Sequence, residues 1–442
     1  MSRKPKRRED VRPAQGDRGG RAAAAALAGG LAASALLVDP RAEASFDAPK
    51  RLAVLLLVAA AAAAAFLFGR PEGRQRIRAR GLARAAFVLA AVALAGGVAA
   101  ALASPRRDLA LDATRAMLLF ALLLPLGASR IVPRYGASLL AVFQSLAALN
   151  AIMSLLERAR IVRPFAVEVL GPRDTTGAFV GNVGYLALAL ALASVAALAA
   201  ALETRRPLVR LLCAAALPLY LADLVVNQNL TSLTALVAGG ATVLFARLGW
   251  RALLPSLAIL GAVAAGIVAY RPARARAVSA FAAARAGAWD SLFTYRLGPW
   301  SAALEMARER PLLGFGPGTF GAEFVTHRLR AEIRARRRFV NPLATSSYGE
   351  AHSEPLQAVA EGGLAGLAAV AAGLALLAAL WRAARQPGPW SAEASLLLAV
   401  LVAGSVASLT WFPFQRPVSS IPLLLAAGRG WRLAAEAGAE GA

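Results

Sequence analysis

The sequence contains little cysteine, little histidine and few acids. Among 442 residues it has one cysteine, Cys213, and two histidines, so no intramolecular disulfide can form. No cysteine and histidine spacing typical of a zinc site is present. The 25 Asp and Glu residues stand against 49 Lys and Arg residues, which gives a formal net charge of +24.

This excess of basic residues does not indicate a nucleic-acid-binding protein. The arginines lie between long apolar runs, where they can set membrane topology or contact lipid head groups and phosphates. No RNA-binding module and no basic helix with interleaved aromatic residues is present. We therefore expect no nucleic acid among the partners.

Hydrophobic residues dominate the composition. They make up 58% of the chain, and the mean hydropathy is +0.57. The apolar runs recur and are long enough to cross a hydrocarbon core of about 30 Å. The sequence thus predicts an all-α polytopic membrane protein with about twelve transmembrane helices. The expected spans are residues 21–38, 52–69, 82–103, 112–128, 135–156, 183–202, 208–226, 231–248, 253–270, 361–381, 392–410 and 418–432.

The predicted organisation has five parts. A basic cytoplasmic arm, residues 1–20, precedes the transmembrane helices of residues 21–270. A long extracytoplasmic segment, residues 271–360, leads to the last transmembrane helices, residues 361–432, and a cytoplasmic tail, residues 433–442. The orientation follows from the arginines of the arm and of the short loop before the third span, because short cytoplasmic loops concentrate positive charge. We interpret the first apolar run as an uncleaved helix, since many spans follow it.

The long segment contains most of the polar sequence that could support chemistry. It carries both histidines, His327 and His352, and a dense set of arginines. Pro299 to Arg308 has apolar residues at helical spacing after a proline, which predicts a helix lying along the membrane face. Gly321 to Phe339 has an apolar stripe beside many arginines, which predicts a basic amphipathic helix facing anionic lipid or an anionic ligand.

A glycine cluster separates these two expected helices. Gly314, Gly316 and Gly318 allow a tight turn with a close approach of the backbone. No strand precedes the cluster, so it is not a dinucleotide-binding motif. The simplest interpretation of the glycines is a turn.

Several motifs, taken together, resemble the O-antigen ligase and O-antigen polymerase superfamily of bacterial envelope glycosyltransferases. The sequence reads R-x3-W from Arg296, P-L-L-G-F-G-P-G-T-F from Pro311, and H-S-x2-L-x4-E-G-G-x2-G from His352. Upstream, the segment G-A-F-V-G-N, which ends at Asn182, is similar to the family's G-T-F-x-N-P-N. The resemblance implies a GT-C-like helical fold with one long extracytoplasmic loop.

The resemblance also implies roles for single residues. Arg173 and Arg296 match arginines thought to hold the diphosphate of a polyprenyl-linked glycan, and His352 matches the loop histidine of the family. Two departures occur: Ser353 follows the histidine where the family usually has asparagine, and the family's Ser-Arg at the eighth span reads Ser-Leu from Ser232. Supporting positions in the matched motifs are Glu361, Gly314, Gly316 and Asn182.

These residue types fit transfer of a sugar from a lipid diphosphate. Arg173 and Arg296 could stabilise the charge on the departing diphosphate without a metal or a cofactor, because guanidinium binds phosphate oxygens in a bidentate manner. A sugar hydroxyl is a weak nucleophile, and His352 could accept its proton during attack. Direct displacement would invert the anomeric centre in one step.

Structural interpretations compete with some of these assignments. His327 matches no family pattern, so we expect a structural role for it. Glu361 could equally cap the tenth transmembrane helix, because acids near a helix N-terminus are favoured by its dipole. Most loop arginines are expected to contact lipid head groups or water. A single extracytoplasmic histidine is more often a surface residue than a catalyst, and only the surrounding motif favours catalysis by His352.

The sequence therefore predicts a membrane glycosyltransferase of the bacterial inner membrane, with a cytoplasmic N-terminus and a periplasmic active loop. Its donor would be a glycan on undecaprenyl diphosphate and its acceptor lipid A-core, which makes it an O-antigen ligase of lipopolysaccharide biosynthesis. The single dominant loop favours a ligase over an O-antigen or exopolysaccharide polymerase, and a protein O-oligosaccharyltransferase is a further alternative. A lipid or polymer transporter is an alternative of another class, but the charges gather outside the membrane and no repeat of the two halves is evident.

Overall fold

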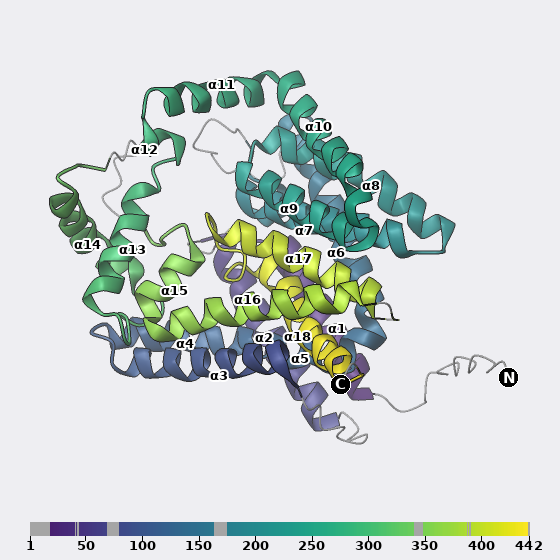
Figure 1. The fold of residues 1–442 in the computed structure, drawn as a ribbon, viewed down its shortest axis with the longest axis horizontal. Helices are drawn as coiled ribbons and strands as arrows, with labels where there is room; N and C mark the ends of the chain where they lie inside the picture. The colour runs from purple at the N-terminus through teal and green to yellow at the C-terminus, as the bar shows by residue number, and fades with distance from the viewer. Residues whose placement is uncertain are drawn as a thin grey trace.

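The computed structural model describes residues 18–39, 41, 44–68, 79–162, 175–339, 348–386, 388 and 390–440. Within these ranges the chain is helical and contains no strand, which confirms the predicted all-α fold (Figure 1). The helices are α1 (Arg18–Leu36), α2 (Asp47–Phe68), α3 (Gly81–Leu102), α4 (Arg107–Ala121), α5 (Leu123–Ala128), α6 (Ile131–Arg158), η1 (Ala178–Val180), α7 (Val183–Glu203), α8 (Pro207–Asn227), α9 (Leu230–Leu248), η2 (Gly249–Ala252), α10 (Leu253–Ala269), α11 (Arg271–Arg285), α12 (Trp289–Leu292), α13 (Leu297–Glu309), α14 (Phe320–Ala335), α15 (Glu354–Gly362), α16 (Leu364–Arg385), α17 (Ser391–Ser408) and α18 (Pro417–Glu440). The start of the basic arm and most of the loop before α3 lie outside these ranges.

Many of these helices are suited to a bilayer, so the protein is a multi-pass membrane protein. Among the described residues, 9 helical stretches are long and apolar enough to cross a membrane. Every predicted span falls on a helix, but α1 and α18 are not among the 9, and α9, η2 and α10 count as one stretch. The predicted number of spans therefore stays a prediction. The 9 stretches are Asp47–Phe68, Gly81–Leu102, Arg107–Ala128, Ile131–Arg158, Val183–Glu203, Pro207–Asn227, Leu230–Ala269, Leu364–Arg385 and Ser391–Ser408.

Helix α7 lies at the centre of the bundle. It packs against α6, α8, α9, α17 and α18. Of the residues in its most apolar stretch, 78% are buried inside the protein. The corresponding fraction is 61% for α17 and 33% or less for every other candidate span. Alternating leucine and alanine suit α7 to this position, because neither side chain carries a polar group that would need a partner.

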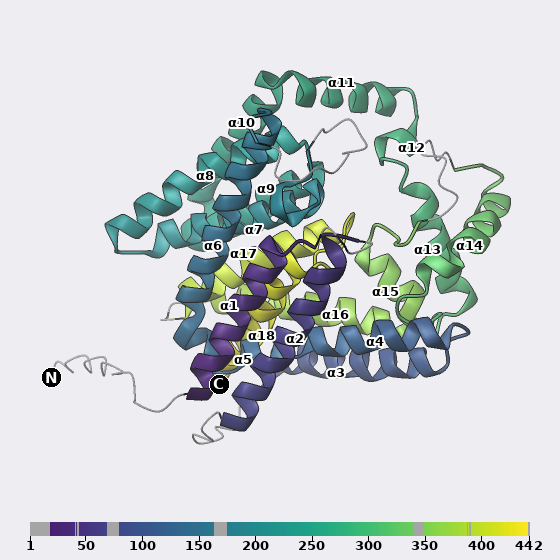
Figure 2. The same cartoon turned by 180° about the vertical axis from the view of Figure 1, so that it is seen from behind.

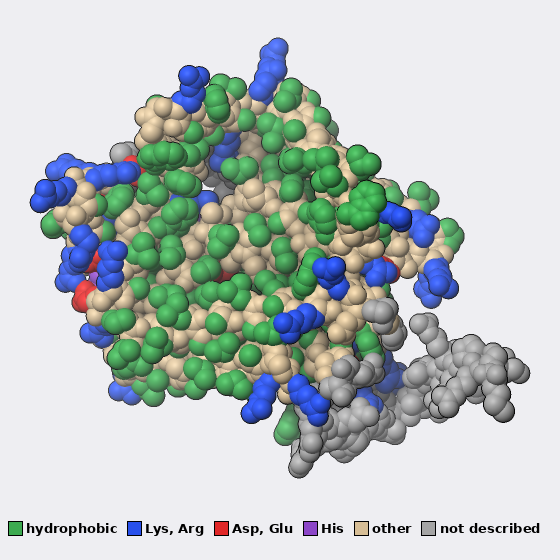
Figure 3. Space-filling view, in the orientation of Figure 1, with side chains coloured by type: hydrophobic (Ala, Val, Ile, Leu, Met, Phe, Trp, Pro, Cys, Tyr) green, Lys and Arg blue, Asp and Glu red, His purple; other side chains and the backbone are tan. Residues whose placement is uncertain are grey.

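The outer surface of the bundle is apolar. Side chains such as Leu56, Leu211 and Leu254 are 62%, 65% and 78% exposed. Figure 3 shows hydrophobic side chains spread over one face, with most Lys and Arg side chains near its margins. Such a surface would promote aggregation in water, whereas in a bilayer it contacts lipid chains.

Small residues allow close helix packing where α5 crosses α18. A Cβ atom added to Gly127 would lie 2.3 Å from the Leu425 carbonyl oxygen, and one added to Gly428 would lie 2.0 Å from the Leu124 carbonyl oxygen. Only glycine fits at both positions. This crossing follows the general pattern of small residues at helix interfaces in membranes.

Several turns between helices meet at one end of the bundle, which we call the loop end. It comprises residues 44–46 before α2, residues 175–182, residues 348–353 and residues 409–416. Lys50 donates from Nζ to the carbonyl oxygens of Phe179 and Val180 over 2.6 and 2.9 Å, and Arg416 lies 4.0 Å from Asp47. Helices α12 to α15 gather at this end, on the left in Figure 1 and on the right in Figure 2.

The segment between α10 and α16 is built from helices in residues 271–339 and 348–362, as the sequence predicted. The two expected helices correspond to α13 and α14. Helix α14 buries one face against α13 and α15 through Phe320, Phe324 and Ala331, while Val325 and Ile333 are 42% and 77% exposed. The amphipathic stripe identified in the sequence thus faces outward, and a second apolar face attaches the helix to the protein.

Candidate functional site

His352 lies at the loop end, just before α15. Its φ of +54° is uncommon for a residue other than glycine. The ring centroids of Tyr348, Trp411 and Phe412 lie 5.6, 5.6 and 5.1 Å from the imidazole centroid. Trp300 donates its indole N–H to the His352 carbonyl oxygen over 3.3 Å. Within the described part of the chain, the buried His352 Nδ1 atom makes no hydrogen bond.

The charge state of His352 is set by burial and by two arginines. Burial, followed by the positive charges of Arg296 and Arg416, lowers the pKa of His352 to about 4. The imidazole is therefore neutral at pH 7, which is the form that accepts a proton. A pKa this low makes the imidazole a weak base in the free protein.

Arg296 reaches this site from the N-terminus of α13. Its guanidinium carbon lies 5.5 Å from the centroid of the Trp411 ring, which itself packs against His352. The structure therefore brings together Arg296 and His352, two residues that the sequence assigned to one site. The other arginine of that assignment, Arg173, lies outside the described residues.

Arg416 is a site residue that the sequence analysis missed. It pairs with Glu350, lies 4.0 Å from Asp47, and places its guanidinium 4.8 and 5.2 Å from the rings of Tyr185 and Phe412. Its side chain is only 20% exposed, and its buried Nε atom has no hydrogen-bond partner among the described residues. The available sequence signal was weak: one arginine in the polar break between α17 and α18, outside every matched motif.

Residues 409–416 are fixed against α15. The Phe414 N–H donates to Glu354 Oε1 over 2.9 Å, so the first turn of α15 anchors this segment. Burial raises the pKa of Glu354 well above its ordinary value. Through this contact α15 holds Trp411, Phe412 and Arg416 beside His352.

Asn182 supports the site by starting α7. Its side-chain oxygen accepts hydrogen bonds from the N–H groups of Gly184 and Tyr185 over 2.8 and 3.2 Å, which makes it an N-cap. The cap fixes the first turn of the helix and with it the Tyr185 ring that lies under Arg416. The structure thus shows Asn182 as the N-cap of α7, and its supporting role in a reaction stays a prediction.

The glycine cluster joins the long segment to the bundle. The N–H groups of Phe315 and Gly316 donate to the carbonyl oxygens of Ala360 and Glu361 over 3.2 and 2.8 Å, while Ser104 Oγ donates to the Phe315 carbonyl oxygen. The cluster thus packs between α15 and the α3–α4 turn. The predicted turn is confirmed, with φ of +65° at Gly314 and +99° at Gly316.

Replacing Gly314 by alanine is expected to destabilise the protein by about 2–4 kcal/mol. The new Cβ would lie 2.3 Å from the Glu361 carbonyl oxygen, on a backbone conformation that alanine disfavours. Thermal unfolding in detergent measures the loss. Gly349→Ala is the matched control, because a Cβ there meets no atom within 4 Å, and it should change stability by less than about 0.5 kcal/mol. Equal midpoints for the two variants would contradict the proposed packing.

Glu361 caps a helix, but not the one that the sequence suggested. Its Oε1 atom accepts from the N–H of Phe320, the first residue of α14, over 3.0 Å, and from Gln357 Nε2 over 3.2 Å. It lies in the last turn of α15, and α16 begins only at Leu364. Burial raises the pKa of Glu361 to about 7.

The pKa of Glu361 predicts a pH dependence of stability. Between its ordinary pKa of 4.5 and about 7, the folded protein binds more protons at this site than the unfolded chain does. Raising the pH through this window therefore lowers the contribution of Glu361 to stability. We expect Glu361→Gln to unfold at a temperature near that of wild type at pH 5 and at a higher temperature at pH 8. Unfolding curves for the two proteins that stay parallel from pH 5 to 8 would contradict this.

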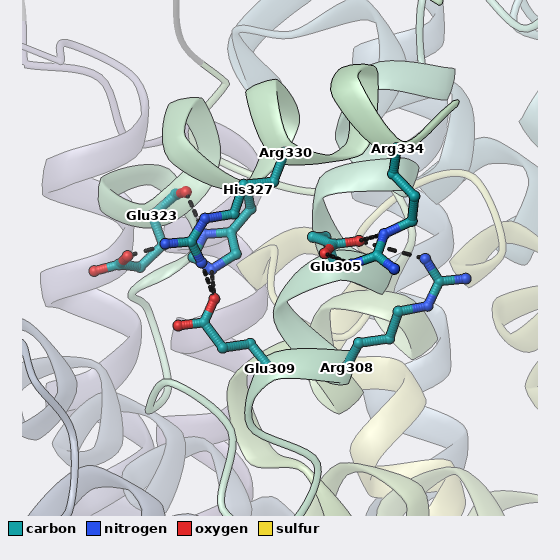
Figure 4. Close-up of polar contacts among 7 residues, drawn as sticks. All are labelled: Glu305, Arg308, Glu309, Glu323, His327, Arg330 and Arg334. Carbon is teal, nitrogen blue, oxygen red and sulfur yellow. Dashed lines mark hydrogen bonds and ion pairs between the residues drawn. The ribbon is translucent and has the colours of Figure 1, made fainter. Parts of the chain in front are cut away.

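His327 has a structural role, as the sequence led us to expect. It is 1% exposed, with Nε2 3.0 Å from Glu309 Oε2 and Nδ1 2.8 Å from the Glu323 carbonyl oxygen. Figure 4 shows this network between α13 and α14, where Arg334 also donates to Glu305 over 2.7 and 3.1 Å. These contacts hold α13 and α14 together, so several arginines of α14 stabilise the packing of the two helices.

Comparison with known proteins agrees with the motifs. Residues 214–371 match the family model described as O-Antigen ligase. This match, which covers residues 214–371 of the 442, supports membership of the O-antigen ligase superfamily. The matched region includes α13 to α15 with Arg296 and His352, whereas Arg416 lies beyond it. Comparison with curated proteins gives no match. The family implies glycosyltransferase activity of the O-antigen ligase or polymerase type, carried out by a membrane protein on glycan-linked substrates.

Proposed function

We propose that the protein is an O-antigen ligase that moves a glycan from undecaprenyl diphosphate to lipid A-core. The observation that carries this proposal is the neutral imidazole of His352 in an aromatic enclosure with Arg296 and Arg416 close by. Two cations beside a neutral base match the needs of a reaction that releases a diphosphate and deprotonates a hydroxyl.

In the proposed mechanism the arginines bind the departing diphosphate. Arg296 and Arg416 contact its oxygens and stabilise the charge that develops there, and Arg173 contributes in the same way by family resemblance. The acceptor hydroxyl attacks the anomeric carbon while His352 takes its proton. A new glycosidic C–O bond forms as the bond to the diphosphate breaks, and undecaprenyl diphosphate leaves with inversion at the anomeric carbon. The arginines supply the positive charge, so we expect activity in the presence of EDTA.

The proposed mechanism also includes a change in the basicity of His352. In the free protein, burial and then the positive charges of Arg296 and Arg416 lower the pKa of the imidazole. A diphosphate between Arg296 and Arg416 would offset those charges and raise the pKa of His352. The histidine would therefore become a stronger base only after the donor has bound.

The predicted orientation belongs to this proposal. With a cytoplasmic N-terminus, the loop end faces the periplasm of a bacterial inner membrane, where lipid A-core and the lipid-linked donor are both present. The segment between α10 and α16 is the longest one between candidate spans in the described ranges, and it supplies both Arg296 and His352. This single dominant segment favours a ligase over a polymerase.

A transfer assay tests the proposal. Purified protein in nanodiscs receives the lipid-linked glycan with EDTA, either with lipid A-core or alone. Transfer that depends on lipid A-core is the expected result. A ladder of longer glycans from the donor alone would make the protein a polymerase with the same site, and transfer to an added protein would make it an O-oligosaccharyltransferase. If no glycan is transferred, or donor instead crosses a vesicle bilayer, the proposed function is wrong.

A further inference from the structure

Three aromatic rings form a file that leads from the protein surface to His352. The ring centroids of Trp289 and Phe293 lie 6.5 Å apart with their planes only 25° from parallel. Phe293 and Trp300 follow at 5.5 Å, and the indole N–H of Trp300 is donated to the His352 carbonyl oxygen. The last ring of the file therefore contacts the residue that we assign as the base.

The outer two rings of the file are open to solvent or ligand. Trp289 is 47% exposed and Phe293 is 39% exposed, whereas Trp300 is half-buried. Large exposed aromatic side chains that lie next to each other mark an interaction surface, either for a ligand or for the membrane interface. Helix α12, which carries Trp289, lies outside the candidate spans.

The backbone between these rings is strained. Thr294 and Tyr295 have φ values of +54° and +61°, a conformation that costs a residue other than glycine about 1–2 kcal/mol. This turn sets Phe293 against Trp300 and leads directly into Arg296. Strain of this kind persists where the surrounding structure requires it and is concentrated at functional sites.

A membrane-interface belt is the simplest alternative for exposed Trp and Phe residues. A belt requires only that the side chains be apolar and lie at the head-group level. It does not account for a file that continues from the near-parallel outer pair through a strained turn to Trp300, whose plane is tilted 56° from that of Phe293, and ends at His352. Flat aromatic faces instead suit sugar rings, whose C–H groups pack on a π-system.

We propose that Trp289, Phe293 and Trp300 form a carbohydrate-binding track for the glycan of the donor. This inference rests on the proposed function, because the reacting end of that glycan would be held by the diphosphate at Arg296 and Arg416. A glycan of several sugars must extend away from the reacting carbon, and the track provides a surface along which it can lie. The track favours long donors over a single sugar on the same lipid.

Variants at Trp289 separate the track from a membrane belt. Trp289→Leu keeps an apolar side chain and removes the flat ring, while Trp289→Tyr keeps a ring. The matched control is Phe281→Leu on α11, where the native ring is 66% exposed outside the file. Two donors are compared in nanodiscs: undecaprenyl diphosphate carrying one N-acetylglucosamine, and the same lipid carrying the long glycan purified from cells that make the protein.

The expected result is specific for the long donor. Trp289→Leu should raise the KM for the long-glycan donor about tenfold with kcat little changed, as expected for loss of one aromatic contact. The KM for the single-sugar donor should stay the same, and Trp289→Tyr and Phe281→Leu should behave like wild type. An unchanged KM for the long donor, or an equal rise for both donors, would overturn the proposal.

A binding measurement separates this inference from the proposed function. The long glycan, released from its lipid, is titrated into wild type and Trp289→Leu and followed by saturation-transfer NMR. Binding to wild type that weakens in the variant supports the track even if no transfer occurs. Transfer by wild type with no difference in glycan binding or KM would overturn the track and leave the proposed function intact. Neither binding nor transfer by wild type would overturn both.

Discussion

Arg416→Gln should lower kcat/KM for glycan transfer about a thousandfold. In the proposed mechanism this side chain binds the departing diphosphate, and removal of a charged group that stabilises a developing anion costs on the order of 10²–10⁵ in rate. Arg416→Lys keeps the charge but loses the bidentate fork, so we expect a loss of about tenfold to a hundredfold. Steady-state kinetics with purified protein in nanodiscs measures both.

Two further variants make this result interpretable. Arg330→Gln removes an ion-paired arginine of α14 whose side chain is 50% exposed, and it should leave kcat/KM within about twofold of wild type. Arg416→Gln combined with Glu350→Gln avoids leaving the Glu350 carboxylate without its partner, so it separates lost function from lost folding. If the double variant unfolds at the wild-type temperature and keeps wild-type activity, Arg416 has no role in the reaction.

His352→Gln should lower kcat about a thousandfold while the KM for the donor changes little. Glutamine fills a similar volume but cannot accept the proton, and general base catalysis contributes about 10²–10⁴ in rate. The remaining activity reflects binding of the donor by the arginines. A variant with wild-type kcat would exclude His352 as the base.

The pH profile of wild type carries a second signature of His352. The pKa of His352 in the free protein is about 4, so the acidic limb of kcat/KM should lie well below the ordinary histidine value of 6.5. Donor binding offsets the charges of Arg296 and Arg416, so the limb of kcat should lie at a higher pH than that of kcat/KM. Both limbs should disappear in His352→Gln. Limbs that persist in this variant belong to another group.

The sequence predicted the helices and named part of the candidate site because those signals are local. Long apolar runs identify the spans. The motifs that surround Arg296 and His352 lie within one continuous segment, so they identify these two residues directly. Glycine spacing also predicted the turn at Gly314 and Gly316, since the need for positive φ is a property of single residues.

The sequence could not predict contacts made across the bundle. Arg416 joins His352, Asp47 and Tyr185 only because turns from distant parts of the chain meet at the loop end. Glu361 was correctly associated with a helix N-terminus, yet that terminus belongs to α14, whose first residue lies 41 positions away in the chain. A single sequence contains no record of such pairings, and they follow only from the way the helices pack.

The most direct test is a cryo-EM structure of the protein in nanodiscs with undecaprenyl diphosphate. We predict density for the diphosphate within hydrogen-bond distance of the guanidinium groups of Arg296 and Arg416, with the His352 imidazole facing it. Diphosphate density bound instead to the arginines of α14, with the site around His352 unchanged, would contradict the proposed site.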